Sequence, residues 1–103
     1  MNRAECLKTA GDAVIARGTR YGTPEDNFER IARRWSSHLI NAGIIALGQS
    51  LSAHNVAIMM CDLKLARLEN DETHEDSWVD IAGYAACGAE ITTERNNGNN
   101  FSA

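Results

Sequence analysis

The chain of 103 residues has little of what marks membrane, secreted or nucleic-acid-binding proteins. It has one proline and no run of 18 apolar residues, so we expect no membrane-spanning segment and no membrane partner. It begins Met-Asn-Arg-Ala-Glu, without a basic and then apolar stretch, so no secretory signal is expected. Its net charge is −4, which argues against nucleic acid as the partner.

Cysteine is scarce as well. The three copies, Cys6, Cys61 and Cys87, are odd in number and form no Cys-x-x-Cys pair, which disfavours a disulfide framework and a zinc cluster. Cys61 and Cys87 lie in apolar stretches, where a thiol usually acts as a small buried hydrophobic group. We therefore expect a reduced, cytoplasmic protein.

The chain has enough apolar sequence for one small helical domain. It is 44% hydrophobic and 23% charged, which is typical of a folded protein. The lack of alternating apolar and polar residues predicts an all-α fold. We expect one domain over residues 1–95 and a disordered polar tail over residues 96–103. A domain of this size buries only about two-thirds of its unfolded surface, which leaves one thin core or a core shared with another chain.

Apolar spacing and capping residues predict four helices. The first covers about residues 3–17 and stops at Gly18. The second begins with Thr23 as its N-cap and Pro24 in its first position, and it ends near Asn41.

The third helix begins after Ser52, and the fourth covers about residues 74–92 behind a capping box of Thr73 and Asp76. Residues 42–51 either cross the core or extend a helix. The fourth helix is apolar on nearly all sides, and four short helices cannot easily enclose one of their own. We therefore expect a four-helix bundle-like domain that is completed by homo-oligomerisation.

Asp80 lies in the sequence Val-Asp-Ile-Ala-Gly-Tyr, where an unpaired carboxylate would be costly. The cations of Lys64 and Arg67 on the third helix would offset its charge. One interpretation is a structural salt bridge between the third and fourth helices. The other is a site in which Asp80 and Lys64 are catalytic, Asp76 and Asp80 hold a metal from one helix face, and Arg67 binds phosphate. Asp76 also has a simpler interpretation as a capping residue.

The basic residues concentrate near helix ends. They either bind phosphate groups or form a solvated helix face. Tyr21 either stacks on a base or caps the end of the bundle, and Asn27 either hydrogen-bonds a ligand or is exposed. The clustered cations are Arg17, Arg20, Arg30, Arg33, Arg34, Lys64 and Arg67.

Four motifs span residues 17–84. They are Arg-Gly-x-x-Tyr-Gly from Arg17, Asn-Phe-x-x-Ile-Ala-x-x-Trp from Asn27, Met-x-x-Leu-Lys-x-x-Arg from Met60, and Asp-x-x-x-Asp-x-x-Gly-Tyr from Asp76. This pattern resembles a small family found in phages and prophages, which implies the cytoplasm of a bacterial host. The candidate ligand-binding residues on these motifs are Arg17, Tyr21, Asn27, Trp35, Arg67 and Tyr84.

The sequence is similar in overall appearance to the MazG-type all-α nucleoside triphosphate pyrophosphohydrolases. Those enzymes are helical oligomers that use Mg²⁺ to split a nucleotide into a monophosphate and pyrophosphate. They carry a Glu-x-x-Glu pair and a later Glu-x-x-Asp pair. Here Asp26-x-x-Glu29 is a degenerate first pair, and Ser77-x-x-Asp80 replaces the second, with Ser77 where Glu would be expected. The resemblance implies Mg²⁺ held by Asp26, Glu29, Asp76 and Asp80.

Three functions are compatible with these residues. The first is a Mg²⁺-dependent pyrophosphohydrolase, in which the metal activates water and Tyr21 and Trp35 flank the base. The second is a non-catalytic protein that sequesters a nucleotide or cyclic nucleotide through arginine contacts and aromatic stacking. The third is a structural or protein-interaction domain, which the apolar fourth helix would support without any ligand.

Overall fold

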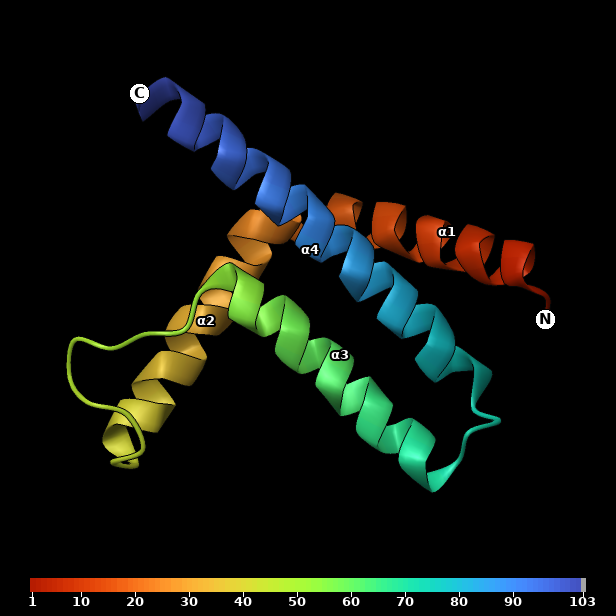
Figure 1. The fold of residues 1–103 in the computed structure, drawn as a ribbon, viewed down its shortest axis with the longest axis horizontal. Helices are drawn as coiled ribbons and strands as arrows, with labels where there is room; N and C mark the ends of the chain where they lie inside the picture. The colour runs from red at the N-terminus through yellow and green to blue at the C-terminus, as the bar shows by residue number, and fades with distance from the viewer. Residues whose placement is uncertain (103) are drawn as a thin grey trace.

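A computed structural model describes the backbone of residues 1–102 and the side chains of residues 1–96. In this part of the chain the fold is all-α, as the sequence predicts, and contains no strand. The helices are α1 (Arg3–Tyr21), α2 (Pro24–Asn41), α3 (Ala53–Asn70) and α4 (Glu75–Ser102). Helices α3 and α4 lie side by side in opposite directions, α1 lies on the other side of α4, and α2 leaves this group at an angle (Figure 1).

Helix α1 is longer than expected, because Gly18 lies inside the helix instead of ending it. The helix ends at Gly22, which has a φ of 87° and donates its backbone N–H to the carbonyl of Gly18 at 3.1 Å. Glycine adopts this left-handed φ without the penalty that other residues incur, whereas a glycine inside a helix costs only about 1 kcal/mol. The expected stop at Gly18 is therefore wrong. Arg17 and Tyr21 both project from ordered helix.

Helix α2 begins as the sequence predicts. The hydroxyl of Thr23 accepts a hydrogen bond from the backbone N of Asp26 at 3.2 Å, and the proline between them occupies the first turn. The connector over residues 42–52 contains turns and no helix, so it does not extend a helix, and none of its residues is buried, so it does not cross the core. Neither of the two expected alternatives is correct. Gly43 and Gly48 adopt φ values of 74° and 94° and allow the connector to reverse direction.

Helix α3 has a complete capping box. The hydroxyl of Ser52 accepts from the backbone N of Asn55 at 3.1 Å, and the side-chain oxygen of Asn55 accepts from the backbone N of Ser52 at 2.9 Å. Both bonds satisfy backbone donors that the first turn of a helix leaves free. The predicted start after Ser52 is confirmed.

Helix α4 is capped by a different residue from the one predicted. The hydroxyl of Thr73, which was expected to cap the helix, donates instead to the Asp71 carboxylate in the preceding turn at 2.6 Å. The imidazole Nδ1 of His74 instead accepts from the backbone N of Ser77 at 3.3 Å. The expected capping box of Thr73 and Asp76 is therefore wrong.

The bounds of α4 also differ from the expected ones, since the helix continues past Thr92 to Ser102. The disordered tail expected over residues 96–103 falls mostly on residues 97–103, whose side chains lie outside the described part of the chain. That expectation stays a prediction.

The core lies where α2, α3 and α4 meet. Helix α4 contacts all three other helices, so much of its apolar surface is covered within one chain. Close approach is possible because α4 carries small residues: a Cβ placed on Gly88 would lie 3.6 Å from the Cβ of Ala57 on α3. The apolar character of α4 therefore does not by itself require another copy to cover it. The buried cluster consists of Phe28, Ala32, Ala53, Val56, Ala57, Cys87 and Ile91.

Candidate functional site

Lys64 of α3 and Asp80 of α4 form a salt bridge, with 2.9 Å between Nζ and Oδ2. The Lys64 side chain is only 12% exposed, and that of Asp80 is 40% exposed. Asp80 also lines a cavity of about 40 Å³ together with Arg17 and Tyr84. A space of this size holds about one water molecule and no phosphate group. The pair therefore has the structural role that the sequence allowed, and a catalytic role for it stays a prediction.

Arg17 lies against two tyrosine rings. Its guanidinium carbon is 5.6 Å from the ring centroid of Tyr21 and 5.8 Å from that of Tyr84. Both distances are within the range of an attractive cation–π contact. The Tyr84 ring is backed by Phe28 of the core, with 6.3 Å between the ring centroids. The structure thus brings together three of the predicted ligand-binding residues.

Arg20 adds a second cation to this group, with its guanidinium carbon 5.9 Å from the Tyr21 ring centroid. Arg17, Arg20 and Tyr21 line a shallow hollow of about 660 Å³ that is open to solvent, together with Ala16 and Thr19. Among the described side chains, neither guanidinium forms a salt bridge. We call Arg17, Arg20 and Tyr21 the arginine–tyrosine hollow. Two uncompensated cations on an exposed ring suit an anionic ligand with a flat ring.

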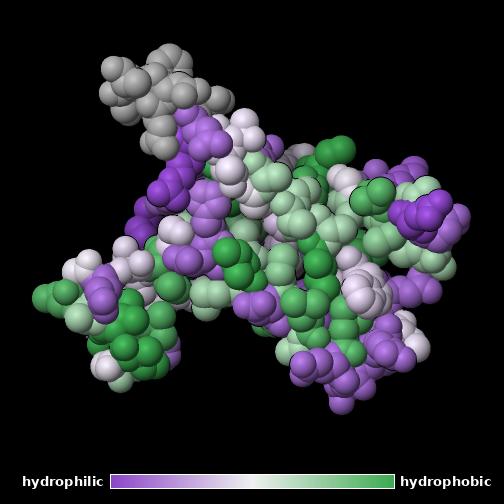
Figure 2. All heavy atoms as spheres, viewed as in Figure 1, coloured by the Kyte–Doolittle hydropathy of each residue, from purple (hydrophilic) through white to green (hydrophobic). Residues whose placement is uncertain are grey.

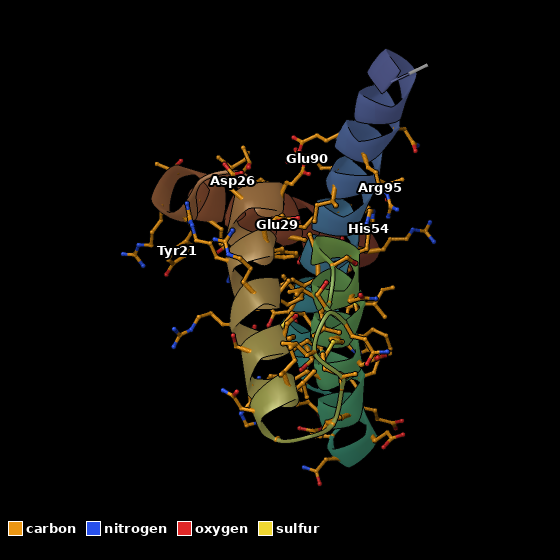
Figure 3. All side chains as sticks on the ribbon, turned by 90° about the vertical axis from the view of Figure 1, so that its left-hand side faces the viewer. Tyr21, Asp26, Glu29, His54, Glu90 and Arg95 are labelled. Carbon is orange, nitrogen blue, oxygen red and sulfur yellow. The ribbon has the colours of Figure 1, made fainter. Side chains whose placement is uncertain are left out.

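Asp26 of α2 lies near acidic residues of α4 that the sequence motifs do not single out. Figure 3 shows Asp26, Glu29 and Glu90 toward the same end of the molecule. The pKa of Glu94 is raised by a hydrogen bond with Glu25, then by reduced hydration and by the negative charges of Glu25, Glu90 and Asp26. We call Glu25, Asp26, Glu29, Glu90 and Glu94 the acidic cluster.

The four predicted metal ligands are not gathered in one place. Asp80 and Glu90 are ten residues apart on one helix, which separates them by about 15 Å along its axis. A cation near Glu90, beside Asp26 and Glu29, would therefore not reach Asp80. In the part of the chain with described side chains, no three His, Cys, Asp or Glu residues lie close enough to hold a metal ion. A magnesium site thus stays a proposal.

The raised pKa of Glu94 leads to a prediction about stability and pH. A carboxyl group with a raised pKa in the folded state stabilises the fold below its ordinary pKa, and this contribution is lost as the pH rises through the raised value. We therefore expect Glu94→Gln to raise the melting temperature at pH 7. The gain should disappear below about pH 4, where free glutamate is protonated too. Thermal unfolding followed by circular dichroism from pH 3.5 to pH 8 checks this.

The control for that experiment is Glu69→Gln, which removes one exposed carboxylate from α3 without touching the acidic cluster. An equal gain in both variants would show that the overall charge of −4, and not the cluster, is responsible. A loss of stability in Glu94→Gln at pH 7 would contradict the prediction.

The remaining predicted site residues lie elsewhere. Trp35 packs against the core, and Asn27 is half-buried in the first turn of α2. Arg67 is exposed and lines a separate hollow of about 500 Å³ at the turn between α3 and α4, together with His74. Asp76 is exposed in the first turn of α4. The structure does not bring these four to the arginine–tyrosine hollow.

Cys61 and Cys87 are poorly suited to act as nucleophiles. Cys87 is buried as predicted, and Cys61 is half-buried. Burial raises the pKa of both thiols, and the charge of Asp62 adds to the effect on Cys61. A raised pKa disfavours the reactive thiolate.

The sequence analysis counts Arg20 among the cations that could bind phosphate but does not assign it to a site with Tyr21, and it does not single out Glu25, Glu90 or Glu94 as site residues. The sequence does contain a signal for Glu90 and Glu94. Glu90 and Glu94 are four residues apart, so they share a helix face directly after the apolar stretch of α4. Arg20 was counted among the basic residues, but the expected stop at Gly18 placed it in a loop instead of one turn after Arg17.

Comparison with known proteins places the chain in a family. Residues 5–92 match the domain of unknown function DUF6378. The chain belongs to this family. A DUF6378 domain thus accounts for most of the chain, and the family description names no activity. No solved structure matches the chain.

Two phage proteins are similar to this DUF6378 chain. The Gene 55 protein of Mycobacterium phage L5 is 41% identical over 80 residues, which cover 77% of this chain and 47% of the phage protein. The Gene 55 protein of Mycobacterium phage D29 is 36% identical over 78 residues, which cover 76% and 46%. The chain therefore spans about half the length of these relatives. The resemblance to a small phage family is confirmed, whereas the likeness to MazG-type enzymes depends on the sequence motifs alone.

Among the described residues, no helix combines the length and the apolar character needed to cross a membrane.

Proposed function

We propose that this DUF6378 domain binds a nucleotide-like small molecule in the arginine–tyrosine hollow. The observation that supports this proposal is the pair of guanidinium groups on the exposed Tyr21 ring, neither with a carboxylate partner among the described side chains. Guanidinium groups bind phosphate oxygens through paired hydrogen bonds, and a tyrosine ring stacks on a base. Arg17 also contacts the Tyr84 ring, which itself packs against Phe28 of the core. These contacts would hold the guanidinium group in place before the ligand binds.

The acidic cluster favours a second candidate, a Mg²⁺-dependent pyrophosphohydrolase. Magnesium is usually bound through one or two carboxylates together with substrate phosphates and water. Asp26 and Glu29 would supply the carboxylates, and the substrate phosphates and water would complete the ligands of the metal. Tyr21 ends α1 and Glu25 lies in the first turn of α2, four residues later. The arginine–tyrosine hollow and the acidic cluster are therefore joined by a short stretch of chain. The metal would neutralise the phosphates and activate water.

Calorimetric titration with ATP, GTP and cyclic AMP tests the binding site. The wild-type protein should bind at least one of them, and Arg17→Met and Arg20→Met should each weaken binding about tenfold or more, because each removes a charged hydrogen bond worth about 1.5–3 kcal/mol. Tyr21→Phe should retain binding and Tyr21→Ala should lose it, since stacking needs only the ring. Arg34→Met, an exposed arginine of α2, is the control.

No binding of any nucleotide to the wild type, or an equal loss in Arg34→Met, would count against the site. Release of pyrophosphate in the presence of Mg²⁺ separates the two candidates. An enzyme should lose this release in Glu29→Gln while it still binds nucleotide. A sequestering protein should bind without any release.

A further inference from the structure

The arginine–tyrosine hollow differs in charge from much of the remaining surface. Hydrophobic side chains cover much of α3 and the middle of α4 on the face shown in Figure 2. In the hollow, the guanidinium carbons of Arg17 and Arg20 lie 5.6 and 5.9 Å from the centroid of one ring, that of Tyr21. Residues three apart on a helix are neighbours on its surface, so both guanidinium groups can reach the same group of a ligand. The hollow therefore places two positive charges where a single phosphate group can bind.

The charge of Arg17 is available to a ligand. Its guanidinium group lies beside the rings of both Tyr21 and Tyr84, and a guanidinium group stacked on aromatic rings keeps the N–H groups at its edge free for hydrogen bonds. Asp80 lines a cavity together with Arg17, but its carboxylate is already paired with Lys64 at 2.9 Å. A ligand group with a charge close to −2 would therefore balance the two arginines of the hollow.

The surroundings of the hollow limit how much negative charge the ligand can carry. Helix α1 ends at Tyr21, and the last carbonyl groups of a helix carry partial negative charge. The acidic cluster begins four residues later with Glu25, at most about 14 Å along the chain, and Figure 3 shows Tyr21 and Asp26 toward the same end of the molecule. The positive start of α2 is already balanced by the Thr23 hydroxyl and by the carboxylates of its first turn. Negative charge beyond what the two arginines balance is therefore repelled.

We propose that the arginine–tyrosine hollow selects nucleotides with one terminal phosphate group, that is, nucleoside monophosphates. Such a phosphate group carries a charge of about −1.5 to −2 at pH 7, which two guanidinium groups balance. The phosphate diester of a cyclic nucleotide carries only one negative charge. A triphosphate brings further negative charge toward the acidic cluster unless Mg²⁺ offsets it. This inference rests on the proposed nucleotide site and names the class of ligand that the site takes.

Calorimetric titration with AMP, cyclic AMP and ATP tests the selection. The buffer contains EDTA and about 20 mM salt, so that charges across the site are little screened. AMP should bind about tenfold or more tightly than cyclic AMP, because the diester loses a charged hydrogen bond. ATP should bind about threefold or more weakly than AMP, because its additional phosphates are repelled. Excess Mg²⁺ in place of EDTA should remove most of the difference between ATP and AMP.

The pH dependence of the two affinities provides a second measurement. The second pKa of a phosphate monoester is about 6, so AMP takes up a proton between pH 7.5 and pH 5, whereas cyclic AMP does not. The ratio of the AMP affinity to the cyclic AMP affinity should therefore fall toward one over this range. Both ligands meet the same protein at each pH, so the ratio reports the charge of the phosphate group.

A pair of matched double variants tests the repulsion by the acidic cluster. Glu25→Gln with Asp26→Asn should raise the affinity for ATP in EDTA more than the affinity for AMP. Asp62→Asn with Glu69→Gln removes two exposed carboxylates from α3 and should leave the ratio of the two affinities unchanged. Circular dichroism shows whether both variants keep their helices. An equal change in both variants would contradict a role for the acidic cluster.

The outcomes separate this inference from the proposed nucleotide site. Cyclic AMP that binds as tightly as AMP overturns the selection, and so does ATP that binds more tightly than AMP in EDTA. In both cases the nucleotide site itself still stands. A protein that binds none of the three ligands overturns the site and the selection together.

Discussion

Phe28→Ala should lower the free energy of unfolding by about 3–5 kcal/mol, the largest loss that we expect from any single substitution in this fold. Phe28 is 2% exposed and belongs to the cluster that joins α2, α3 and α4, so its removal leaves a cavity in a thin core. A domain of about 100 residues has only about 5–15 kcal/mol of stability. Thermal and urea unfolding measure the loss, which corresponds to a melting temperature lower by about 12–20 °C.

Phe28→Leu is the matched control, because it retains most of the apolar volume and should cost much less than the alanine variant. The prediction fails if the two variants lose equal stability, since the cost would then come from the ring contact with Tyr84 and not from the cavity. The alanine variant should also weaken nucleotide binding if Tyr84 supports Arg17 as proposed.

Asp80→Asn should cost about 2 kcal/mol of stability and should cost more than Lys64→Met. The two partners of this salt bridge differ in exposure: Lys64 is 12% exposed and Asp80 is 40% exposed. Removal of the aspartate charge leaves a largely buried ammonium group without its partner, which is strongly unfavourable. Removal of the lysine leaves a carboxylate that water still reaches, so the remaining charge is partly hydrated.

Urea unfolding of both variants checks this order. Asp76→Asn is the control, because Asp76 is exposed one turn earlier on α4 and forms no salt bridge among the described side chains. A larger loss in Lys64→Met than in Asp80→Asn would contradict this order and would show that the carboxylate left without its partner is the more costly of the two unpaired charges.

The features that local sequence determines were predictable. The caps at Thr23 and Ser52 follow from side chains that bond backbone groups within three residues. The start of α4 was not predictable in the same way, because Thr73 bonds Asp71 in the preceding turn and leaves the cap to His74. Here two local patterns compete, and the turn geometry decides between them.

The candidate site shows more clearly how far the sequence alone can predict the structure. The cation–π group of Arg17, Tyr21 and Tyr84 contains residues that the motifs had singled out, but their meeting depends on α1 continuing through Gly18. The partners of Asp26 and Glu29 depend on how far along α4 the helix α2 crosses. The point at which α2 crosses α4 is set by packing in the core. It cannot be predicted from the spacing of residues within one helix. The sequence therefore indicates the acidic pair on α2 but does not reveal which acidic residues of α4 lie near it.

Helix α1 is the least anchored element of the fold, and this has a consequence for ligand binding. Its only buried residue is Ala10, whereas Leu7 and Ile15 are largely exposed. Elements with few buried contacts detach from a native protein at a lower free energy than its core does. A ligand held by Arg17 and Tyr21 would bind only while α1 rests on Tyr84, so its binding energy would also hold α1 in place. Occupancy of the hollow would then determine how firmly the first helix is docked on the other three.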